Sequence, residues 1–408
     1  MRLAPTQLAL RVAGRPTAMP SASQGGARRR VAAAAATLPI EKQQQPLAAA
    51  ADAPVVLQYT SLVRGQLVRR YKRFLGDVRL EAAATAAEAA AAAPPAAGTA
   101  AAGGAGSCDE ARGEVAAAQA GITTVHVPNT GPMTGLLGAL PAPALLSVSA
   151  DPKRKYPHTL EWLRPDGGQG SWVGTHSAKA NAMVRHLLEA RLLPGLPPYG
   201  RVQAEVKYGA DGKSRVDFVL HPSSEASSSS DRDAADAAGS GAPAKRRRSA
   251  RSARAAAGTE EAAAVTAGPA SDAAADQAAT DPPPAGQRGA CFVEVKSVTL
   301  AEDRGQGGGH IALFPDTVSE RAQRHLRELT ALAAGGGSAA LVFVVQRDDC
   351  AAFAPCHEKD PEYGRLVREA AAAGVALLPV VCSLDEAAGA VRYRGTLPLD
   401  LDYKWKAR

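Results

Sequence analysis

Residues 291–298 read C-F-V-E-V-K-S-V, with apolar and charged side chains alternating around Glu294 and Lys296. Successive side chains of a β-strand point to opposite faces of a sheet, so this alternation predicts a strand that presents Glu294 and Lys296 on the same face. The two charged groups then lie about 7 Å apart along the strand. We interpret the rest of the chain outward from this charged pair.

A second strand is predicted at residues 214–220, S-R-V-D-F-V-L, directly upstream once a low-complexity stretch is left out. Asp217 is expected on the opposite face from the apolar side chains of this strand, which are Val216, Phe218 and Leu220. If this strand and residues 291–298 form a hairpin, Asp217 and Glu294 converge on one patch beside Lys296.

Two carboxylates on one patch suit a hard cation such as Mg²⁺ or Mn²⁺. Such cations prefer oxygen ligands, and Asp217 and Glu294 would leave coordination positions open for water and phosphate. A metal there would lower the pKa of a bound water and stabilise charge on a phosphate, with Lys296 orienting the water. Glu205, in A-E-V-K at 204–207, is a further candidate carboxylate. An ordinary cross-strand salt bridge is the alternative, and both interpretations stay open.

The segments around this pair predict an α/β domain with a mixed sheet. Two short apolar runs, 339–346 and 375–382, flank a predicted helix at 360–373, and this order is typical of a parallel crossover. Another helix is predicted at 318–334, where T-V-S-E from Thr317 has the form of a capping box. The remaining elements predicted here are a helix at 178–193 and a strand at 202–208.

The N-terminal part predicts a small antiparallel β-barrel. Residues 55–81 contain short strands in which Gly65 and Gly76 are interpreted as turns, and 123–127 and 144–148 add further extended segments. Short strands punctuated by turns favour a barrel.

Basic and aromatic side chains are interleaved in this N-terminal part. The net charge of the chain is +7, and residues 51–81 and 122–165 together hold ten basic and five acidic side chains. Cations bind phosphates and aromatic faces stack on bases, so these clusters indicate nucleic-acid binding; solvated strand edges are the alternative. The candidate DNA contacts are Arg69, Arg70, Tyr71, Lys72, Arg73, Lys153, Arg154, Lys155 and, on the helix predicted at 318–334, Arg321 and Arg324. The last two share a helix face with His325 and Glu328, which either meets phosphate or carries i,i+4 pairs.

Shifts in composition divide the chain. Residues 1–50 are rich in Arg, Ala, Ser and Thr and poor in acidic side chains, which is the composition of an organelle transit peptide. Residues 82–121 and 222–288 have few large apolar side chains, so we expect disordered, low-complexity insertions. The expected domains are a barrel at 51–165 and an α/β domain at 166–408, each carrying one insertion. We expect a chloroplast protein, with the mitochondrion as the alternative and the nucleus less favoured.

Several segments resemble the sugar fermentation stimulation protein (SfsA) family in their order and spacing, apart from the leader and the insertions. They are R-R-Y-K-R-F-L-G-D-V at 69–78, H-V-P-N-T-G-P-M-T-G at 126–135, K-R-K-Y-P-H-T at 153–159, E-V-K-Y-G at 205–209, R-V-D-F at 215–218, F-V-E-V-K-S-V-T-L-A-E at 292–302 and F-P-D-T-V-S-E-R-A-Q-R-H-L-R-E-L at 314–329. The resemblance implies an OB-type barrel followed by a PD-(D/E)-x-K nuclease-like domain, in which Asp217, Glu294 and Lys296 match the nuclease motif. It also implies DNA binding with little sequence preference and a regulatory role in bacterial sugar metabolism.

The chain departs from the family pattern on the helix that contains Asn181. Family members often carry a carboxylate soon after this asparagine, whereas this chain has Arg185 and His186, with Glu189 a turn later. This departure leaves open whether the helix supplies an acidic ligand and whether the nuclease-like site is fully catalytic.

These observations favour a DNA-binding protein with weak sequence preference. The alternative is a Mg²⁺- or Mn²⁺-dependent nuclease that uses Asp217, Glu294 and Lys296, and a third hypothesis is a noncatalytic scaffold that binds protein partners. The expected partner is DNA, duplex or single-stranded. No membrane contact is expected because no run of about 18 apolar residues occurs, and the oligomeric state, a homodimer included, is left open.

Overall fold

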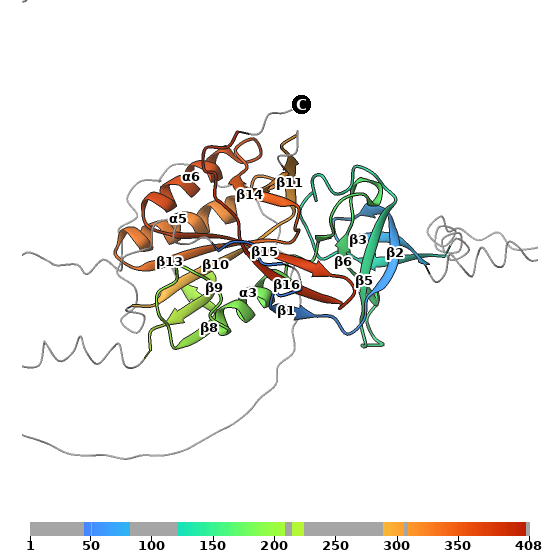
Figure 1. Ribbon diagram of the computed structural model, residues 1–408, viewed down its shortest axis with the longest axis horizontal. Helices are drawn as coiled ribbons and strands as arrows, with labels where there is room; N and C mark the ends of the chain where they lie inside the picture. Colours follow the sequence, from blue (N-terminus) through green and yellow to red (C-terminus); the bar gives the residue numbers. More distant parts are fainter. Residues whose placement is uncertain are drawn as a thin grey trace, which may run out of the picture. The chain divides into compact units, whose positions relative to one another are not determined.

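The computed structural model describes residues 45–49, 51–81, 121–208, 214–223, 289–305 and 309–404. All of them belong to one unit, Ala34–Arg408. The predicted leader and the two predicted insertions fall almost entirely outside the described residues. The described part contains a seven-stranded sheet flanked by helices, a small barrel and a three-stranded sheet (Figure 1).

The seven-stranded sheet is mixed. Its strands are β1 (Val55–Gln58), β8 (Arg201–Tyr208), β9 (Ser214–His221), β10 (Cys291–Val298), β13 (Ser338–Val345), β15 (Ala376–Asp385) and β16 (Ala390–Thr396). They follow the order β1-β16-β15-β13-β10-β9-β8. β10, β13 and β15 are parallel, which confirms the predicted crossover, and β9 is the antiparallel neighbour of β10.

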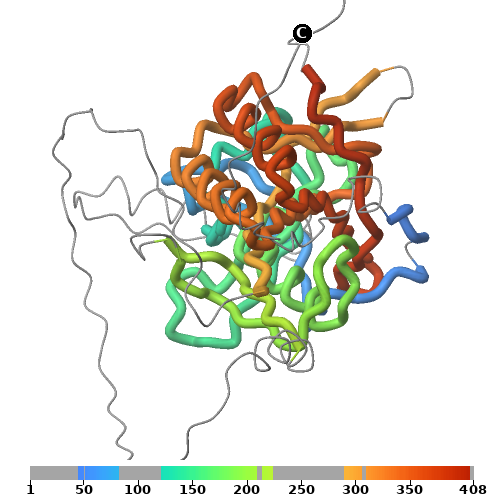
Figure 2. The backbone as a smooth tube through the Cα atoms, turned by 90° about the vertical axis from the view of Figure 1, so that its left-hand side faces the viewer, coloured from blue at the N-terminus to red at the C-terminus, as the bar shows by residue number. Residues whose placement is uncertain are grey.

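Helices cover both faces of this sheet. α3 (Lys179–Glu189) packs its apolar side chains on the face that carries Val295. α5 (Glu320–Ala334) and α6 (Pro361–Ala372) pack together on the other face, which carries Phe292 (Figure 2). β10 therefore contributes to two cores, because its side chains alternate between the faces.

The start of α5 differs from the prediction. Ser319 is the N-cap, since its hydroxyl oxygen accepts the N–H of Ala322 at 3.3 Å and its backbone is extended, with φ −140° and ψ 93°. The capping box predicted from Thr317 is therefore wrong by two residues. An N-cap residue has an extended backbone and directly precedes the first helical residue. Ser319 holds that position before Glu320, whereas Thr317 lies two residues further away.

The smaller part is a β-barrel, as expected. Its strands are β2 (Val63–Tyr71), β3 (Leu75–Leu80), β4 (Ile122–His126), β5 (Ala142–Val148), β6 (His158–Leu163) and β7 (Val173–Gly174). They follow the order β4-β3-β2-β5-β6-β7, and a parallel pair between His126 and Thr159 closes five of them into a barrel. β1 lies within the range expected for the barrel but pairs with β16 of the large sheet, and β7 extends the barrel sheet beyond residue 165.

Gly65 and Gly76 lie inside β2 and β3, so the prediction that they form turns is wrong. A Cβ at Gly65 would lie 2.7 Å from the carbonyl oxygen of Arg79, and one at Gly76 would lie 2.9 Å from Cδ1 of Leu67. Gly65 is required because the backbone of Arg79 cannot move away from a side chain there, whereas a side chain at Gly76 would have to displace the end of Leu67. The turn between the two strands falls at residues 72–74 instead.

A three-stranded sheet completes the larger part and was not anticipated from the sequence. It consists of β11 (Leu300–Asp303), β12 (His310–Phe314) and β14 (Cys350–Pro355), with β12 in the middle. None of the helices in the described residues is long and apolar enough to cross a membrane.

Candidate functional site

Asp217 lies where the hydrogen-bonded ladder between β9 and β10 ends. The ladder runs from the Cys291–Leu220 pair to the Val293–Phe218 pair and goes no further. Beyond it, Oδ2 of Asp217 accepts the backbone N–H of Val295 at 2.7 Å, and Oδ1 accepts an amide N–H of Asn181 in α3 at 2.8 Å. The side chain thus replaces a backbone carbonyl at the end of the ladder.

The apolar side chains around Asp217 differ from the prediction. Phe218 and Leu220 face α3, whereas Val216 packs into the core beneath α5 and α6. β9 therefore changes face at Asp217, and its partner β8 does so at Glu205, which has a left-handed backbone with φ 56°. The predicted common face of Val216, Phe218 and Leu220 is wrong because strict alternation is interrupted at this irregularity.

Glu294 is almost completely buried, with 3% of its surface exposed. Its Oε1 atom accepts a hydrogen bond from Nζ of Lys296 at 2.6 Å and lies 2.5 Å from Nδ1 of His325 in α5. Its Oε2 atom is buried and has no hydrogen-bond partner among the described residues. We call Asp217, Glu294, Lys296 and His325 the carboxylate cluster.

The pKa values of the two carboxylates in the cluster are shifted in opposite directions. Burial raises the pKa of Asp217, and the charge of Glu294 raises it further. Burial alone would raise the pKa of Glu294 as well, but the hydrogen bond to His325 and the charge of Lys296 outweigh it and hold the pKa below its usual value. The surroundings therefore favour the charged form of Glu294, and its charge disfavours the charged form of Asp217.

Glu205 does not join this cluster. Its side chain is 57% exposed and pairs with Nη1 of Arg215 at 3.1 Å, so the expectation that it is a third carboxylate at this site is wrong. α3 supplies the amide of Asn181, while Arg185 and Glu189 form an exposed ion pair. Within the described residues, no group of three or more His, Cys, Asp or Glu side chains is arranged to hold a metal ion.

The sequence interpretation missed two members of the surroundings. His325 is buried against Glu294, whereas Arg321 and Arg324 on the same helix are exposed. The hydroxyl of Tyr208 lies near Glu328 and Glu294, whose charges, after burial, raise its pKa. No local signal marks either residue, because their neighbours come from other strands and helices.

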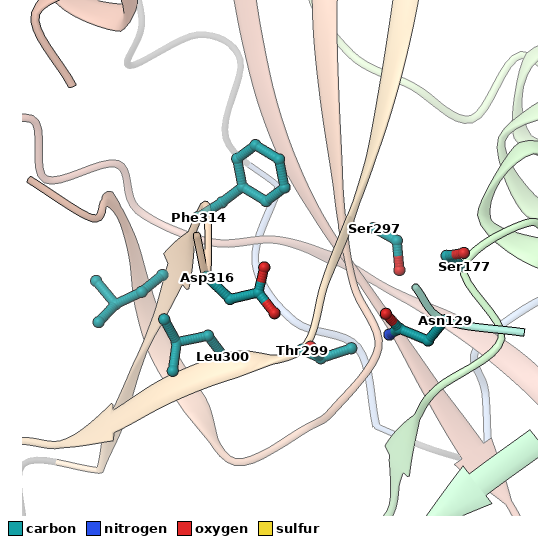
Figure 3. A pocket seen from close by; sticks show the side chains of 8 residues that line it. Asn129, Ser177, Ser297, Thr299, Leu300, Phe314 and Asp316 are labelled. Atoms are coloured by element: carbon teal, nitrogen blue, oxygen red, sulfur yellow. The ribbon is translucent and has the colours of Figure 1, made fainter. Parts of the chain in front are cut away.

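A polar pocket opens at the C-terminal end of β10, where Ser297, the residue after Lys296, lines it. It has a volume of about 330 Å³, part of it open to solvent. Figure 3 shows the side chains around this space, and the lining residues are Asn129, Ser177, Ser297, Thr299, Leu300, Leu313, Phe314 and Asp316. Binding sites of α/β sheets commonly lie at the carboxyl ends of the parallel strands.

Arg70 supports the loop that contributes Asn129 to this pocket. Its Nη2 atom donates to the carbonyl oxygens of Asn129 at 2.5 Å and Gly131 at 2.8 Å. A Cβ at Gly131 would lie 3.2 Å from Oδ2 of Asp316, so the loop passes close to this carboxylate. Arg70, which was predicted as a DNA contact, therefore holds the loop of residues 129–131 in place through these hydrogen bonds.

Two other side chains of the predicted DNA-binding segment are also engaged within the barrel. Nε of Arg69 forms an ion pair with Oδ2 of Asp77 at 2.6 Å, and the hydroxyl of Tyr71 donates to Oδ1 of the same carboxylate at 2.9 Å. Lys72 and Arg73 are exposed at the turn that follows. Arg69 keeps 70% of its side chain exposed beside this ion pair, so the segment presents Arg69, Lys72 and Arg73 to solvent.

The two basic clusters meet on one rim of the barrel. Leu75, directly after the turn, pairs with His126 of β4, and His126 pairs with Thr159 of β6. Nη2 of Arg154 donates to the hydroxyl of Thr159 at 2.9 Å, which ties the 153–156 loop to the same place. We call the exposed cations Lys72, Arg73, Lys153, Arg154 and Lys155 the cationic rim.

A buried ionic centre lies below His126, between the barrel and α3. Glu161 of β6 is 1% exposed and receives Nζ of Lys179 at 2.9 Å, Nδ1 of His176 at 3.0 Å and the hydroxyl of Ser147 at 2.6 Å. Lys179 also lies over the ring of Tyr59, 4.0 Å from its centre. These contacts join the barrel to the first turn of α3.

Comparisons with known proteins agree with this two-part architecture. Residues 112–175 match the family model described as the SfsA N-terminal OB domain, and residues 271–388 match the sugar fermentation stimulation protein RE domain.

Similar sequences include proteins described as sugar fermentation stimulation protein homologs. One from Acaryochloris marina is 32% identical over 338 residues, covering 83% of this chain and 93% of the relative. One from Nostoc sp. is 33% identical over 342 residues, covering 84% and 97%. The solved structure of Pyrococcus furiosus SfsA in complex with Ca²⁺ matches in fold, with 19% identity, a TM-score of 0.52, and coverage of 85% of this chain and 100% of that one.

Proposed function

Because this chain belongs to the sugar fermentation stimulation protein (SfsA) family, we propose that it binds DNA through the cationic rim, with little sequence preference. The observation that carries this proposal is the meeting of the two basic clusters on one rim. Lysine and arginine side chains bind phosphates and release counterions, and such contacts carry no sequence information. A regulatory role linked to sugar metabolism, as the family name suggests, is part of the proposal.

Salt-dependent binding tests this function. Fluorescence anisotropy with the chain lacking residues 1–44 should give affinities that fall linearly with the logarithm of salt concentration. Replacing Lys72 and Arg73 by Ala should weaken binding to all sequences alike. For duplex DNA, the slope should decrease by about 0.9 for each phosphate contact that is lost.

A matched variant separates rim contacts from a general loss of positive charge. The control is Arg201→Ala, which removes an exposed cation on β8. This substitution should leave the salt dependence of DNA binding unchanged. Equal effects of the rim and control substitutions would mean that the rim is not the binding surface. Absence of salt-sensitive binding at micromolar protein would refute the function itself.

A divalent-metal-dependent nuclease is the second candidate function, favoured by the carboxylate cluster. Asp217 and Glu294 lie on adjacent strands, and a buried carboxylate oxygen without a partner, Oε2 of Glu294, is costly unless a cation or water satisfies it. Asp217 and Glu294 are the residues that would hold Mg²⁺ or Mn²⁺. Such a metal, when bound, supplies a water of lowered pKa and stabilises charge on a phosphate. Lys296 would hold Glu294 in place and offer positive charge beside it.

Cleavage assays test the nuclease. Supercoiled plasmid is incubated with Mn²⁺ and the wild-type chain, beside Asp217→Asn and Glu294→Gln variants. Cutting by the wild type alone supports the second candidate, whereas equal cutting by all three proteins means contamination. If neither DNA binding nor cleavage is found, a scaffold that binds protein partners becomes the better explanation.

We also propose that residues 1–50 direct the chain to the chloroplast, on the composition of this segment. Import of a fluorescent reporter fused to these residues would test the proposal. Mitochondrial or nuclear fluorescence would contradict it.

A further inference from the structure

The turn between β2 and β3 holds two long cations in a strained backbone. Lys72 and Arg73 both have left-handed conformations, with φ 48° and 62°. This conformation is unfavourable for a residue that has a Cβ, and Gly or Asn would avoid most of the cost. Strained residues of this kind cluster at ligand-binding sites. Lys72 and Arg73 therefore occupy positions at which Gly or Asn would be more favourable for folding.

Phe74 completes this turn and exposes its ring. It is 49% exposed, and it is the single aromatic among the exposed large apolar side chains of the described residues. Its backbone is held at both ends, since its N–H donates to the carbonyl of Lys72 and its carbonyl accepts the N–H of Val127, each at 2.8 Å. The ring is thus presented to solvent from a fixed backbone rather than from a loose loop.

The charges around Phe74 indicate what the ring contacts. Lys72 and Arg73 precede it in the turn, and the 153–156 loop adds further cations on the same rim. Cations and an exposed aromatic ring on one rim are suited to bind a polyanion that also has flat apolar surfaces. Single-stranded nucleic acid has this chemistry, because its phosphates bind cations and its unpaired bases stack on aromatic rings. Paired bases in a duplex do not expose their faces.

We propose that Phe74 is a stacking platform for an unpaired base, so that the cationic rim prefers single-stranded DNA to fully paired duplex. The inference rests on the proposed DNA binding and specifies the form of DNA that is bound. Lys72 and Arg73 bind the flanking phosphates, and the base lies on the ring of Phe74.

The proposal is tested with a Phe74→Ala variant, with Val318→Ala as a matched control because Val318 is also exposed, by 60%. Anisotropy is measured for one labelled oligonucleotide, single-stranded and annealed to its complement. Phe74→Ala should weaken single-strand binding about 5- to 150-fold, the range for loss of one stacked base. Its salt slope and its duplex affinity should stay unchanged. Phe74→Trp should restore single-strand affinity, and circular dichroism confirms that each variant is folded.

A second readout reports stacking directly. 2-Aminopurine placed in the single strand should lose fluorescence on binding to the wild type and keep it on binding to Phe74→Ala. Equal affinity of the wild type for both DNA forms, or no effect of Phe74→Ala on the single strand, would overturn the stacking proposal while DNA binding stands. Absence of salt-sensitive binding to either form would overturn both.

Discussion

Glu161 should be among the most sensitive acidic positions for stability. Its carboxylate is buried and holds Lys179, His176 and Ser147 between the barrel and α3. In Glu161→Gln, the neutral amide keeps the size of the side chain but leaves Lys179 without a buried anion. Removing one partner of a buried ion pair typically destabilises a protein by about 3–5 kcal/mol. We expect a loss near the lower end of that range, because the side chain of Lys179 is 22% exposed and regains some water.

The effect should depend on pH. Burial alone would raise the pKa of Glu161, but the hydrogen bond and charge of His176 and the charge of Lys179 hold it below its ordinary value of 4.5. A lowered carboxyl pKa contributes stability above the unfolded pKa and loses it as the pH falls through the folded pKa. The difference between the wild type and Glu161→Gln should therefore be full at pH 7 and shrink below about pH 4.5.

Urea unfolding of both proteins between pH 4 and pH 8 measures this difference. Glu205→Gln is the matched control, because Glu205 is exposed and its pair with Arg215 is worth about 0–1 kcal/mol. A loss for Glu161→Gln no larger than that of Glu205→Gln, or one independent of pH, would refute the reasoning.

Two further predictions concern the strands. Gly65→Ala should lower the free energy of unfolding in urea by about 1–3 kcal/mol, because the added Cβ meets Cγ1 of Val78 at 2.7 Å. Gly138→Ala is the control and should lower it far less, because the space around Gly138 is open. Asp217→Asn should become more stable relative to the wild type as the pH rises from 4 to 7. The reason is that burial and the charge of Glu294 raise the pKa of Asp217, so its charged form destabilises the folded wild type. A fall in the relative stability of the variant over that pH range would contradict this.

Much of the fold could be predicted because its signals are local. The alternation in residues 291–298, the buried runs that became β13 and β15, and the helix between them each depend on neighbours in the sequence. The pairing of the strands that carry Asp217 and Glu294 also followed from two local patterns. The family resemblance used the same information, since its motifs are contiguous.

The predictions that failed concern distant neighbours. Gly65 and Gly76 resemble turn residues in sequence, and only the close approach of other strand atoms shows why they are glycine. Glu205 resembles a ligand, but an irregularity in β8 leaves it on the surface.

Local patterns were enough to predict the main strands and helices, the uneven charge and the family, because periodicity, composition and contiguous motifs depend on residues near one another in the chain. Tertiary structure decided that His325 contacts Glu294, that the turn at 72–74 and the 153–156 loop share one rim, and that Glu161 joins the barrel to α3. These pairings depend on strand registers and helix packing between distant segments. No local pattern carries that information.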